Sequence, residues 1–285
     1  MPVVWASLVL TAGPGAAATL DPLASGPRTL ATVVAWAAWG GVLAATLVPR
    51  PAALTTLRVA AGLAVVGAVL ATTRASAGAG AAALVGTVVV AGAALHPAVG
   101  FAFVNGAAYG DERRFPLRLP PALLLGPLPL AVPLLGVAAL AGPLLLAGGH
   151  PLVGIPAMVA GWPLAAGLGR SLHSLSRRWA VLVPAGIVLK DPLALTDPVL
   201  FTRDLVTSLR PLPYPNDPAA DVCDLRLGAV AGSLVLELSE EISLVRTNTR
   251  RRGGEIVRAR RVAFSPRLSD DLLAEATRRR TASAG

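Results

Sequence analysis

Long apolar runs almost free of charge make up the N-terminal part of the chain, and they limit the folds that it can adopt. Residues 1–169 contain only ten charged residues, whereas residues 170–285 contain 18 basic and 13 acidic ones. Over the whole chain 14% of the residues are charged, against about 25% in a typical soluble domain. A boundary between two solvents near residue 170 explains this difference. The sequence therefore predicts a helical bundle in a lipid bilayer, followed by a soluble domain.

A helix needs about 20 apolar residues to cross the hydrocarbon core of a bilayer. Six segments meet or approach this length: 2–20, 30–48, 53–73, 81–103, 121–146 and 152–168. Gly13-Pro14-Gly15 interrupts the first segment. That segment lacks the positively charged region that precedes the apolar part of a signal peptide, so we interpret it as a helix. The prediction is an all-α membrane bundle of about six transmembrane helices over residues 1–170.

The distribution of arginine predicts the orientation of the bundle, because short cytoplasmic loops carry the excess of Lys and Arg. Alternate connections and the segment after the last span hold Arg50, Arg58, Arg113, Arg114, Arg118, Arg170, Arg177 and Arg178. The remaining connections hold only Arg28 and Arg74. We therefore expect a multi-pass protein of the cell membrane, with both termini and the C-terminal domain in the cytoplasm.

His96 is the one titratable residue well inside a predicted span, and ionisable residues at that depth are candidates for function. Asn105 is its nearest polar companion, about two and a half turns along the same predicted helix. No Asp, Glu or Lys lies in an apolar core, so a proton relay has no second side chain. Interhelical hydrogen bonding and a helix break at His96-Pro97 are the alternative roles.

The densest polar cluster of the membrane half is Asp111-Glu112-Arg113-Arg114, in the fourth connection. Two interpretations are open. The cluster is either a coupling loop that docks on the cytoplasmic domain or a solvated loop that marks the cytoplasmic side. We favour the solvated loop, since charge of this kind is expected in any cytoplasmic connection.

After residue 178 the apolar runs become short and are separated by Pro, Gly, Asp and Asn, a pattern typical of strands and turns. The expected strands are 179–183, 186–190, 199–202, 205–209, 225–227, 233–238, 242–246 and 255–264. A helix capped by Ser269 follows, with Asp270 and Asp271 in its first turn and Arg278 to Arg280 in its last, charges that complement the helix dipole. We expect a connector at residues 171–178 and a small cytoplasmic β-rich (α+β) domain with a C-terminal helix at residues 179–285. Residues 178–285 are expected to fold alone.

The run Arg-Arg-Trp-Ala-Val-Leu-Val-Pro-Ala-Gly-Ile-Val-Leu at residues 177–189 is typical of a strand that leaves the membrane and turns at Gly186. With the order of strands and terminal helix over residues 178–280, it resembles the bacterial pleckstrin-homology-like domains that follow transmembrane helices in membrane proteins. The resemblance implies scaffolding, or contact with proteins and lipids, without catalysis. It transfers no functional residue to this chain.

The amino-acid composition also indicates a codon bias. Of the 25 basic residues 24 are Arg, and Ala, Gly and Pro are abundant. This composition is typical of a GC-rich genome, so we expect a bacterial, actinobacterial source. The same bias supplies Arg wherever a positive charge is wanted, so the number of arginines is not by itself a sign of a binding site.

The sequence lacks the motifs of several catalytic classes. Lys190 is the only lysine and is followed by Asp191-Pro192 with no Gly-rich run before it, which excludes a phosphate-binding P-loop. The single cysteine, Cys223, excludes an intramolecular disulfide and argues against a thiolate metal cluster. Zinc-protease and nucleophile-elbow motifs are absent. We expect no catalytic residue, no cofactor and no metal.

Arg250, Arg251 and Arg252 stand together at a predicted turn with no acidic neighbour before Glu255. A domain tethered beneath a bilayer faces anionic headgroups, and each such contact is worth about 1 kcal/mol. These arginines are therefore candidates for contact with anionic lipid, and no nucleic acid is expected.

These observations favour a non-catalytic integral membrane protein. Its cytoplasmic domain is expected to scaffold an unknown protein partner or to contact the inner leaflet. A transporter or transporter subunit is the first alternative, and a ring of polar residues in a bundle cavity would favour it. A membrane-embedded enzyme is the second alternative.

Overall fold

The chain forms two compact units. A computed structural model describes residues 1–212, 222–247 and 254–279. The helical unit consists of residues 1–103 and 127–173, and the β-rich unit consists of residues 104–126 and 174–285. The β-rich unit thus includes the fourth connection between the apolar segments, whereas the sequence analysis placed the whole domain after residue 178.

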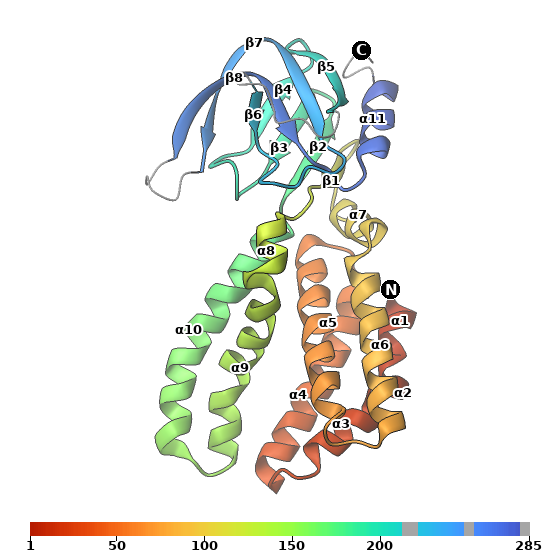
Figure 1. The fold of residues 1–285 in the computed structure, drawn as a ribbon, viewed down its shortest axis with the longest axis vertical. Coiled ribbons are helices and arrows are strands. Elements are labelled where there is room, and N and C mark those ends of the chain that lie inside the picture. The colour runs from red at the N-terminus through yellow and green to blue at the C-terminus, as the bar shows by residue number, and fades with distance from the viewer. Residues whose placement is uncertain (213–221, 248–253, 280–285) are drawn as a thin grey trace. The chain divides into compact units, whose positions relative to one another are not determined.

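Nine helices of the described residues lie wholly or mainly in the helical unit (Figure 1). They are α1 (Pro2–Ala6), α2 (Leu8–Thr11), α3 (Gly13–Leu20), α4 (Ser25–Leu47), α5 (Pro51–Ala71), α6 (Ala77–Leu95), α7 (Pro97–Asn105), α9 (Pro127–Ala147) and α10 (Pro151–Leu175). Among the described residues α4, α5, α6, α9 and α10 are long and apolar enough to cross a membrane. The segment 2–11 meets the same test only together with 13–20, at a bend of 48°. The bend coincides with the Gly13-Pro14 interruption seen in the sequence.

Small residues bring the helices of this unit together. A Cβ atom on Gly161 of α10 would overlap the carbonyl oxygen of Ala138 in α9, and one on Gly26 would overlap that of Ala147. Small side chains allow such close approach of helix backbones in lipid. Large apolar side chains point outward instead: Leu152 is 90% exposed and Leu10 is 81% exposed. An outward apolar surface of this kind suits hydrocarbon and not water.

The β-rich unit contains two four-stranded sheets, in the orders β1-β2-β3-β4 and β5-β7-β8-β6. The first sheet is formed by β1 (Arg113–Pro116), β2 (Trp179–Val183), β3 (Gly186–Lys190) and β4 (Val199–Thr202), all antiparallel. The second is formed by β5 (Val206–Pro211), β6 (Val222–Asp224), β7 (Leu234–Arg246) and β8 (Glu255–Phe264). Only the β6–β8 pairing is parallel among the described pairs. The short helix α8 (Pro121–Leu125) also belongs to this unit.

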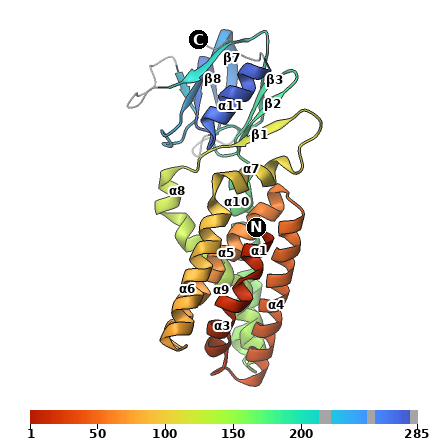
Figure 2. The ribbon, with the colours of Figure 1, turned by 90° about the vertical axis from the view of Figure 1, so that its right-hand side faces the viewer.

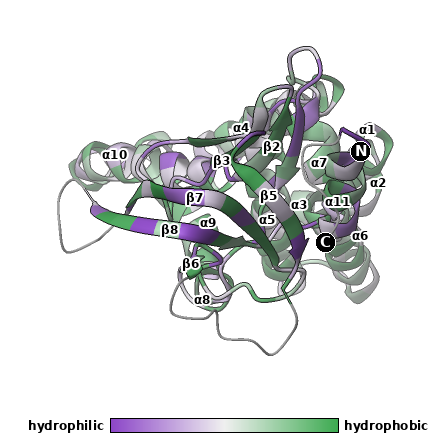
Figure 3. Ribbon diagram, turned by 90° about the horizontal axis from the view of Figure 1, so that it is seen from above, coloured by the Kyte–Doolittle hydropathy of each residue, from purple (hydrophilic) through white to green (hydrophobic). Residues whose placement is uncertain are grey.

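A terminal helix, α11 (Ser269–Arg278), lies against the strands of this unit (Figure 2). Leu272 and Ala276 form its buried stripe, and the Arg279 side chain that follows donates a hydrogen bond to the Leu182 carbonyl of β2 at 3.2 Å. The core also holds Phe201 and Phe264, both almost fully buried. Hydrophilic and hydrophobic residues alternate along β8 (Figure 3), as expected for a strand with one buried and one solvated face.

Long apolar helices followed by a β-rich region with a final helix are confirmed, with several local corrections. β2, β3, β4 and β8 match the expected bounds. Leu227, in the strand expected at 225–227, instead adopts a positive φ of 53° in a turn, and the strand in this region is β6. The two strands expected at 233–238 and 242–246 form one strand, β7, with an irregular register against β8. Leu268, not Ser269, is the N-cap of α11, and no side chain caps it. α10 extends to Leu175 through most of the expected connector.

Candidate functional site

The fourth connection supplies a strand to the β-rich unit, and this strand organises the site. β1 pairs with β2 from Arg113 opposite Leu182 to Pro116 opposite Trp179. The side chain of Phe115 is 2% exposed, and Leu117 forms a bridge with Pro266 just before α11. The expectation of a merely solvated loop was therefore wrong. The connection docks on the domain because its apolar residues complete the core of the first sheet.

Asn105 and the polar cluster of this connection lie together. The side-chain amide of Asn105 donates to the Arg114 carbonyl at 2.7 Å and accepts from the Arg114 backbone N–H at 2.9 Å. These two bonds are the pair that a backbone residue of a neighbouring strand would make with Arg114. The guanidinium of Arg114 pairs with Glu112 at 2.8 Å and lies 5.6 Å from the ring centre of Trp179. Asp111 and Arg113 remain exposed. Asn105 thus fixes the conformation of the loop at Arg114.

A polar cavity of about 290 Å³ opens between this connection and the end of α11. It is lined by Asn105, Ala108, Gly110, Asp111, Glu112, Arg113, Glu275, Arg278 and Arg279. The Glu275 carboxylate is largely buried and pairs with Arg279 at 2.6 Å and also with Arg278. Three acidic and three basic side chains therefore balance each other in the cavity. Such a surface can hold a polar or zwitterionic group but favours no strong anion or cation.

A buried ion pair joins this connection to the rest of the unit. Arg178 and Asp191 are each 2% exposed, and the guanidinium contacts both carboxylate oxygens at 2.7 Å. The third nitrogen of the guanidinium donates to the carbonyl of Arg118 at 2.9 Å. The sequence placed Arg178 among the arginines that indicate the cytoplasmic side, and the structure shows in addition that its side chain is buried in an ion pair. No signal in the sequence links it to Asp191, because the whole β2–β3 hairpin separates the two residues.

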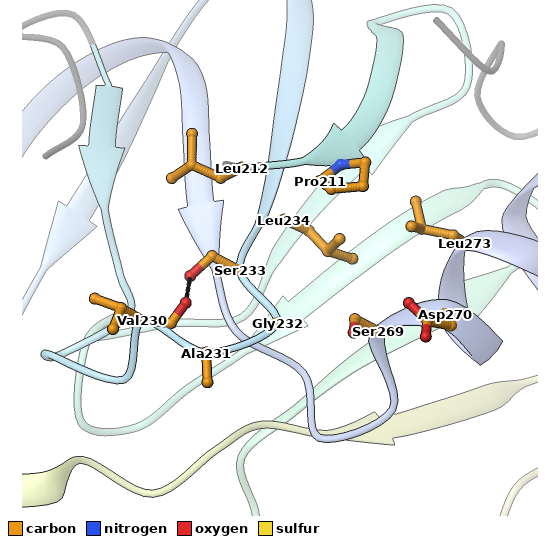
Figure 4. A pocket seen from close by; sticks show the side chains of 10 residues that line it. All are labelled: Pro211, Leu212, Val230, Ala231, Gly232, Ser233, Leu234, Ser269, Asp270 and Leu273. Carbon is orange, nitrogen blue, oxygen red and sulfur yellow. Dashed lines mark hydrogen bonds between the residues drawn. The ribbon is translucent and has the colours of Figure 1, made fainter. Parts of the chain in front are cut away.

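A second cavity, of about 330 Å³, lies beside the start of α11 (Figure 4). Its walls are mostly apolar, from Pro211, Leu212, Val230, Ala231, Leu234 and Leu273, with Gly232, Ser233, Ser269 and Asp270 completing the lining. The Ser233 hydroxyl donates to the Val230 carbonyl at 2.6 Å, which holds the loop that forms one wall. This cavity could not be predicted from the sequence, because the strand and loop residues that line it carry no motif.

His96 marks a helix break. α6 ends at Leu95, His96 is its exposed C-cap residue and α7 begins at Pro97. One imidazole nitrogen accepts a hydrogen bond from the Ala98 backbone N–H at 3.3 Å. The break at His96-Pro97, one of the expected alternatives, is what the structure shows. Arg58 donates to the Ala94 carbonyl at 3.2 Å and so satisfies a free carbonyl at this helix end.

Several charged groups of the β-rich unit have structural partners. Hydrogen bonds from Arg210 and Ser208 hold the pKa of the Glu237 carboxyl below its ordinary value. Burial raises the pKa of the Cys223 thiol, which is 4% exposed and therefore poorly reactive. Arg250, Arg251 and Arg252, the candidates for lipid contact, lie outside the described residues.

Within the described part of the chain, no group of three or more His, Cys, Asp or Glu side chains is arranged to hold a metal ion. Of the three carboxylates in the cavity beside β1, Glu275 pairs with Arg278 and Arg279, and Glu112 pairs with Arg114.

Comparison with protein-family models, with curated proteins and with solved structures finds no match to this chain.

Proposed function

We propose that this chain is a multi-pass membrane protein whose β-rich unit is a non-catalytic contact module for the inner leaflet of the cell membrane. The observation that carries the proposal is the division of this module between two segments of chain. The chain passes between the helical and β-rich units three times, after residues 103, 126 and 173. A module with three covalent attachments to apolar helices stays beneath the membrane, as an inner-leaflet contact requires.

The strand pairing supports a common side for both segments. Residues 104–126 and 174–285 fold into one unit, and β1 pairs with β2. A single folded unit cannot lie on both faces of a bilayer, so α9 and α10 cross it as a pair. The arginine distribution assigns the cytoplasm to that side. On the opposite side Arg28 forms an ion pair with Asp21 at 2.5 Å. This pair increases the difference in net positive charge between the two sides.

The helical unit supports an anchoring role more than a transport path. The buried polar side chains identified in it are Thr46 and Thr87, among the described residues. Thr46 donates to the Leu43 carbonyl at 2.6 Å and Thr87 to the Ala83 carbonyl at 2.8 Å. Both hydroxyls are satisfied by their own helix, so they do not form the polar ring that a transporter would need.

The end of the β7–β8 pair where Arg246 lies opposite Glu255 is the part of the module suited to lipid. Ile256, opposite Val245 in the pairing, is 73% exposed. Arg258 is exposed two residues later, on the same face of β8. An exposed large aliphatic side chain next to arginine suits an interface where apolar contact and anionic headgroups coexist. The three consecutive arginines at residues 250–252 belong to the same connection in the sequence.

Orientation is tested with reporters in the full chain. An enzyme reporter active only in the cytoplasm should work when fused after Gly285, and also when inserted at Gly110 in the fourth connection. A reporter active only outside should work at Gly149, between α9 and α10. The module model is abandoned if Gly110 and Gly285 report opposite sides.

Lipid contact is tested with a polarity-sensitive dye on full-length protein in nanodiscs. The dye is placed at Ile256→Cys in a Cys223→Ser background, with Leu200→Cys in β4 as the matched exposed control. We expect a blue shift at position 256 in discs with anionic lipid, reversed by salt and reduced when Arg250, Arg251 and Arg252 are changed to Ser. Equal spectra in neutral and anionic discs contradict the proposal.

A further inference from the structure

The apolar run at residues 121–146 is divided at Gly126 into α8 and α9. α9 alone has 21 residues, and a helix of that length spans about 30 Å, the thickness of the hydrocarbon core of a bilayer. α8 ends at Leu125, one residue before Pro127 begins α9, and it belongs to the β-rich unit. In the proposed orientation α8 is therefore attached to the cytoplasmic end of a crossing helix, where lipid headgroups and acyl chains meet.

α8 exposes apolar side chains. Leu125 is 87% exposed, and Leu124, Pro121 and Ala122 are exposed as well. No residue from 119 to 126 is charged. A helix that is apolar and exposed around most of its surface does not suit water, and it belongs either in a protein core or in lipid.

The loop after β6 lies against the start of α8, although it is distant in the sequence. A Cβ atom on Gly228 would lie 3.9 Å from Cδ of Pro121. Ser265 holds the two segments together, because its hydroxyl donates to the Ala229 carbonyl and its carbonyl accepts from the Arg118 backbone N–H at 2.8 Å. All of these residues belong to the β-rich unit, so its own fold fixes the loop beside α8.

This loop also presents apolar side chains outward. Leu227 and Val230 are exposed, whereas Ala229 between them is buried. No residue from 227 to 232 is charged, and the preceding Arg226 is buried and paired with Asp224 at 2.8 Å. Two distant segments thus contribute to one exposed apolar region. We call it the α8–loop surface, formed by Leu124, Leu125, Leu227 and Val230.

The backbone at Leu227 is a second, independent observation. Among the described residues Leu227 is the one non-glycine residue with a positive φ, at 53°. A residue with a Cβ atom is strained there, whereas glycine is not. The side chain of Leu227 is 37% exposed, so burial in the unit compensates for only part of this strain. Strain of this kind, kept at an exposed leucine, indicates that the side chain serves a contact outside the unit.

We infer that the α8–loop surface inserts into the interfacial region of the inner leaflet, where its partners are the glycerol backbone and the upper acyl chains of the lipids. The inference rests on the proposed function, because it requires the β-rich unit to lie beneath that leaflet. The contact differs in kind from that of the β7–β8 pair, since apolar insertion depends on buried area and not on headgroup charge. Asp270, which is exposed and lines the same cavity as Val230, offers no attraction to anionic lipid.

Insertion is measured by fluorescence quenching on full-length protein in neutral nanodiscs. A bimane dye is placed at Leu227→Cys or Val230→Cys in a Cys223→Ser background, and part of the lipid carries a nitroxide near the top of its acyl chain. We expect quenching at both positions, unchanged by salt or by anionic lipid. Leu200→Cys in β4, 45% exposed against 42% for Val230, is the matched control and should not be quenched.

The substitution Leu227→Asn separates lipid contact from packing within the unit. Asparagine adopts a positive φ more readily than leucine, so the Tm of the solubilised protein should be retained or rise. Quenching of the dye at Val230→Cys should weaken in this variant, because an apolar side chain is lost from the inserted surface. Unchanged quenching, or a lowered Tm with unchanged quenching, overturns the inference.

The results also separate this inference from the proposed function. Dyes at positions 227 and 230 that remain unquenched, with the blue shift expected at Ile256→Cys, overturn the α8–loop surface and leave the proposed function in place. Quenching in neutral discs without a shift at Ile256→Cys supports the surface and excludes the β7–β8 contact. Reporters at Gly110 and Gly285 on opposite sides exclude both. Circular dichroism checks each variant, and Val230→Cys decides if Leu227→Cys does not fold.

Discussion

The helical and β-rich units differ in how their most buried polar side chains are hydrogen-bonded. In the helical unit Thr87 bonds to a carbonyl four residues earlier in its own helix. In the β-rich unit Arg178 reaches a carbonyl in a distant segment, at Arg118, and binds Asp191 across a hairpin. The two buried threonines of the first unit, Thr46 and Thr87, are satisfied within their own helices, which can supply such bonds before they pack, whereas Trp5 donates to the Trp39 carbonyl of another helix at 2.9 Å. The second depends on contacts between distant segments, so it is more sensitive to loss of one segment.

The largest expected effect comes from removing β1. Residues 174–285 alone should not unfold cooperatively, because the edge of β2 and the core around Phe115 are left open. A fusion of residues 104–126 to residues 174–285, with a Gly/Ser linker in place of α9 and α10, should fold. Circular dichroism during heating measures both proteins. This replaces the expectation that residues 178–285 fold alone.

Two substitutions in β1 of the fusion test whether the buried side of this strand is what stabilises the sheet. Phe115→Asp in the fusion should abolish cooperative unfolding, whereas Arg113→Ser, at an exposed position of the same strand, should retain it. A cooperative transition for residues 174–285 without β1 would show that the strand is an accessory to the sheet and not part of its core.

Breaking the buried ion pair is expected to have the next largest effect. Asp191→Ala leaves the Arg178 guanidinium buried without its counter-charge, which should lower the free energy of unfolding of the fusion by about 3–5 kcal/mol. Arg178→Met with Asp191→Leu should recover most of this loss. Urea unfolding measures each variant.

An exposed ion pair in the same unit provides a comparison for the buried Arg178–Asp191 pair. Arg210 pairs with Glu237 at 2.7 Å, and its side chain is 43% exposed. Arg210→Gln should therefore cost at most about 1 kcal/mol. Equal losses for Arg210→Gln and Asp191→Ala would mean that the Arg178–Asp191 pair is solvated.

The helical unit should respond to steric substitutions instead. Gly161→Ala places a methyl group against the Ala138 carbonyl and should destabilise the detergent-solubilised protein by about 1–3 kcal/mol. Gly167→Ala, in the same helix with nothing within 4 Å of the new methyl group, should be neutral or stabilising. Thermal unfolding of the full chain compares the two, and a similar loss for both would argue against close packing at Gly161.

The smallest expected effect is a pH dependence of the β-rich unit. The folded-state pKa of Glu237 is depressed, first by the hydrogen bond from Arg210 and then by that from Ser208. Its contribution to stability is therefore present above the ordinary carboxyl pKa of 4.5 and is lost as the pH falls through the lower folded value. Glu237→Gln in the fusion should flatten the acid side of the stability curve, measured by urea unfolding at several pH values. An unchanged acid limb would exclude this carboxylate as a source of the pH dependence.

Hydrophobic periodicity, with Gly and Pro at the breaks, was sufficient to predict most of the helices and strands. The five long helices follow from the apolar runs, and the 48° bend follows from Gly13-Pro14-Gly15. β2 and β3 match their predicted bounds because runs rich in β-branched residues on either side of Pro184-Ala185-Gly186 favour a β-hairpin. Proline after His96 likewise ends α6 where a helix interior would lose a donor.

The site could not be predicted to the same extent. Arg113 to Pro116 is a short run in a charged loop, and its partner strand begins at Trp179, beyond both α9 and α10. The same arginines look like topology signals when their partners are unknown. α8 and the loop that carries Leu227 belong to the two separate segments of the β-rich unit, and only the folded unit places Gly228 beside Pro121.

The sequence by itself thus determined which segments suit lipid and which suit water, because hydrophobicity and backbone propensity act over a few residues at a time. It also determined most of the strands after residue 178 and the position of the last helix. Only the tertiary structure decided that the connection before α9 belongs to the β-rich unit, that Arg178 is buried and that the loop carrying Leu227 lies against α8. Those outcomes depend on which distant segments bury each other, and the free energy of such contacts is a property of the assembled core and of no single segment.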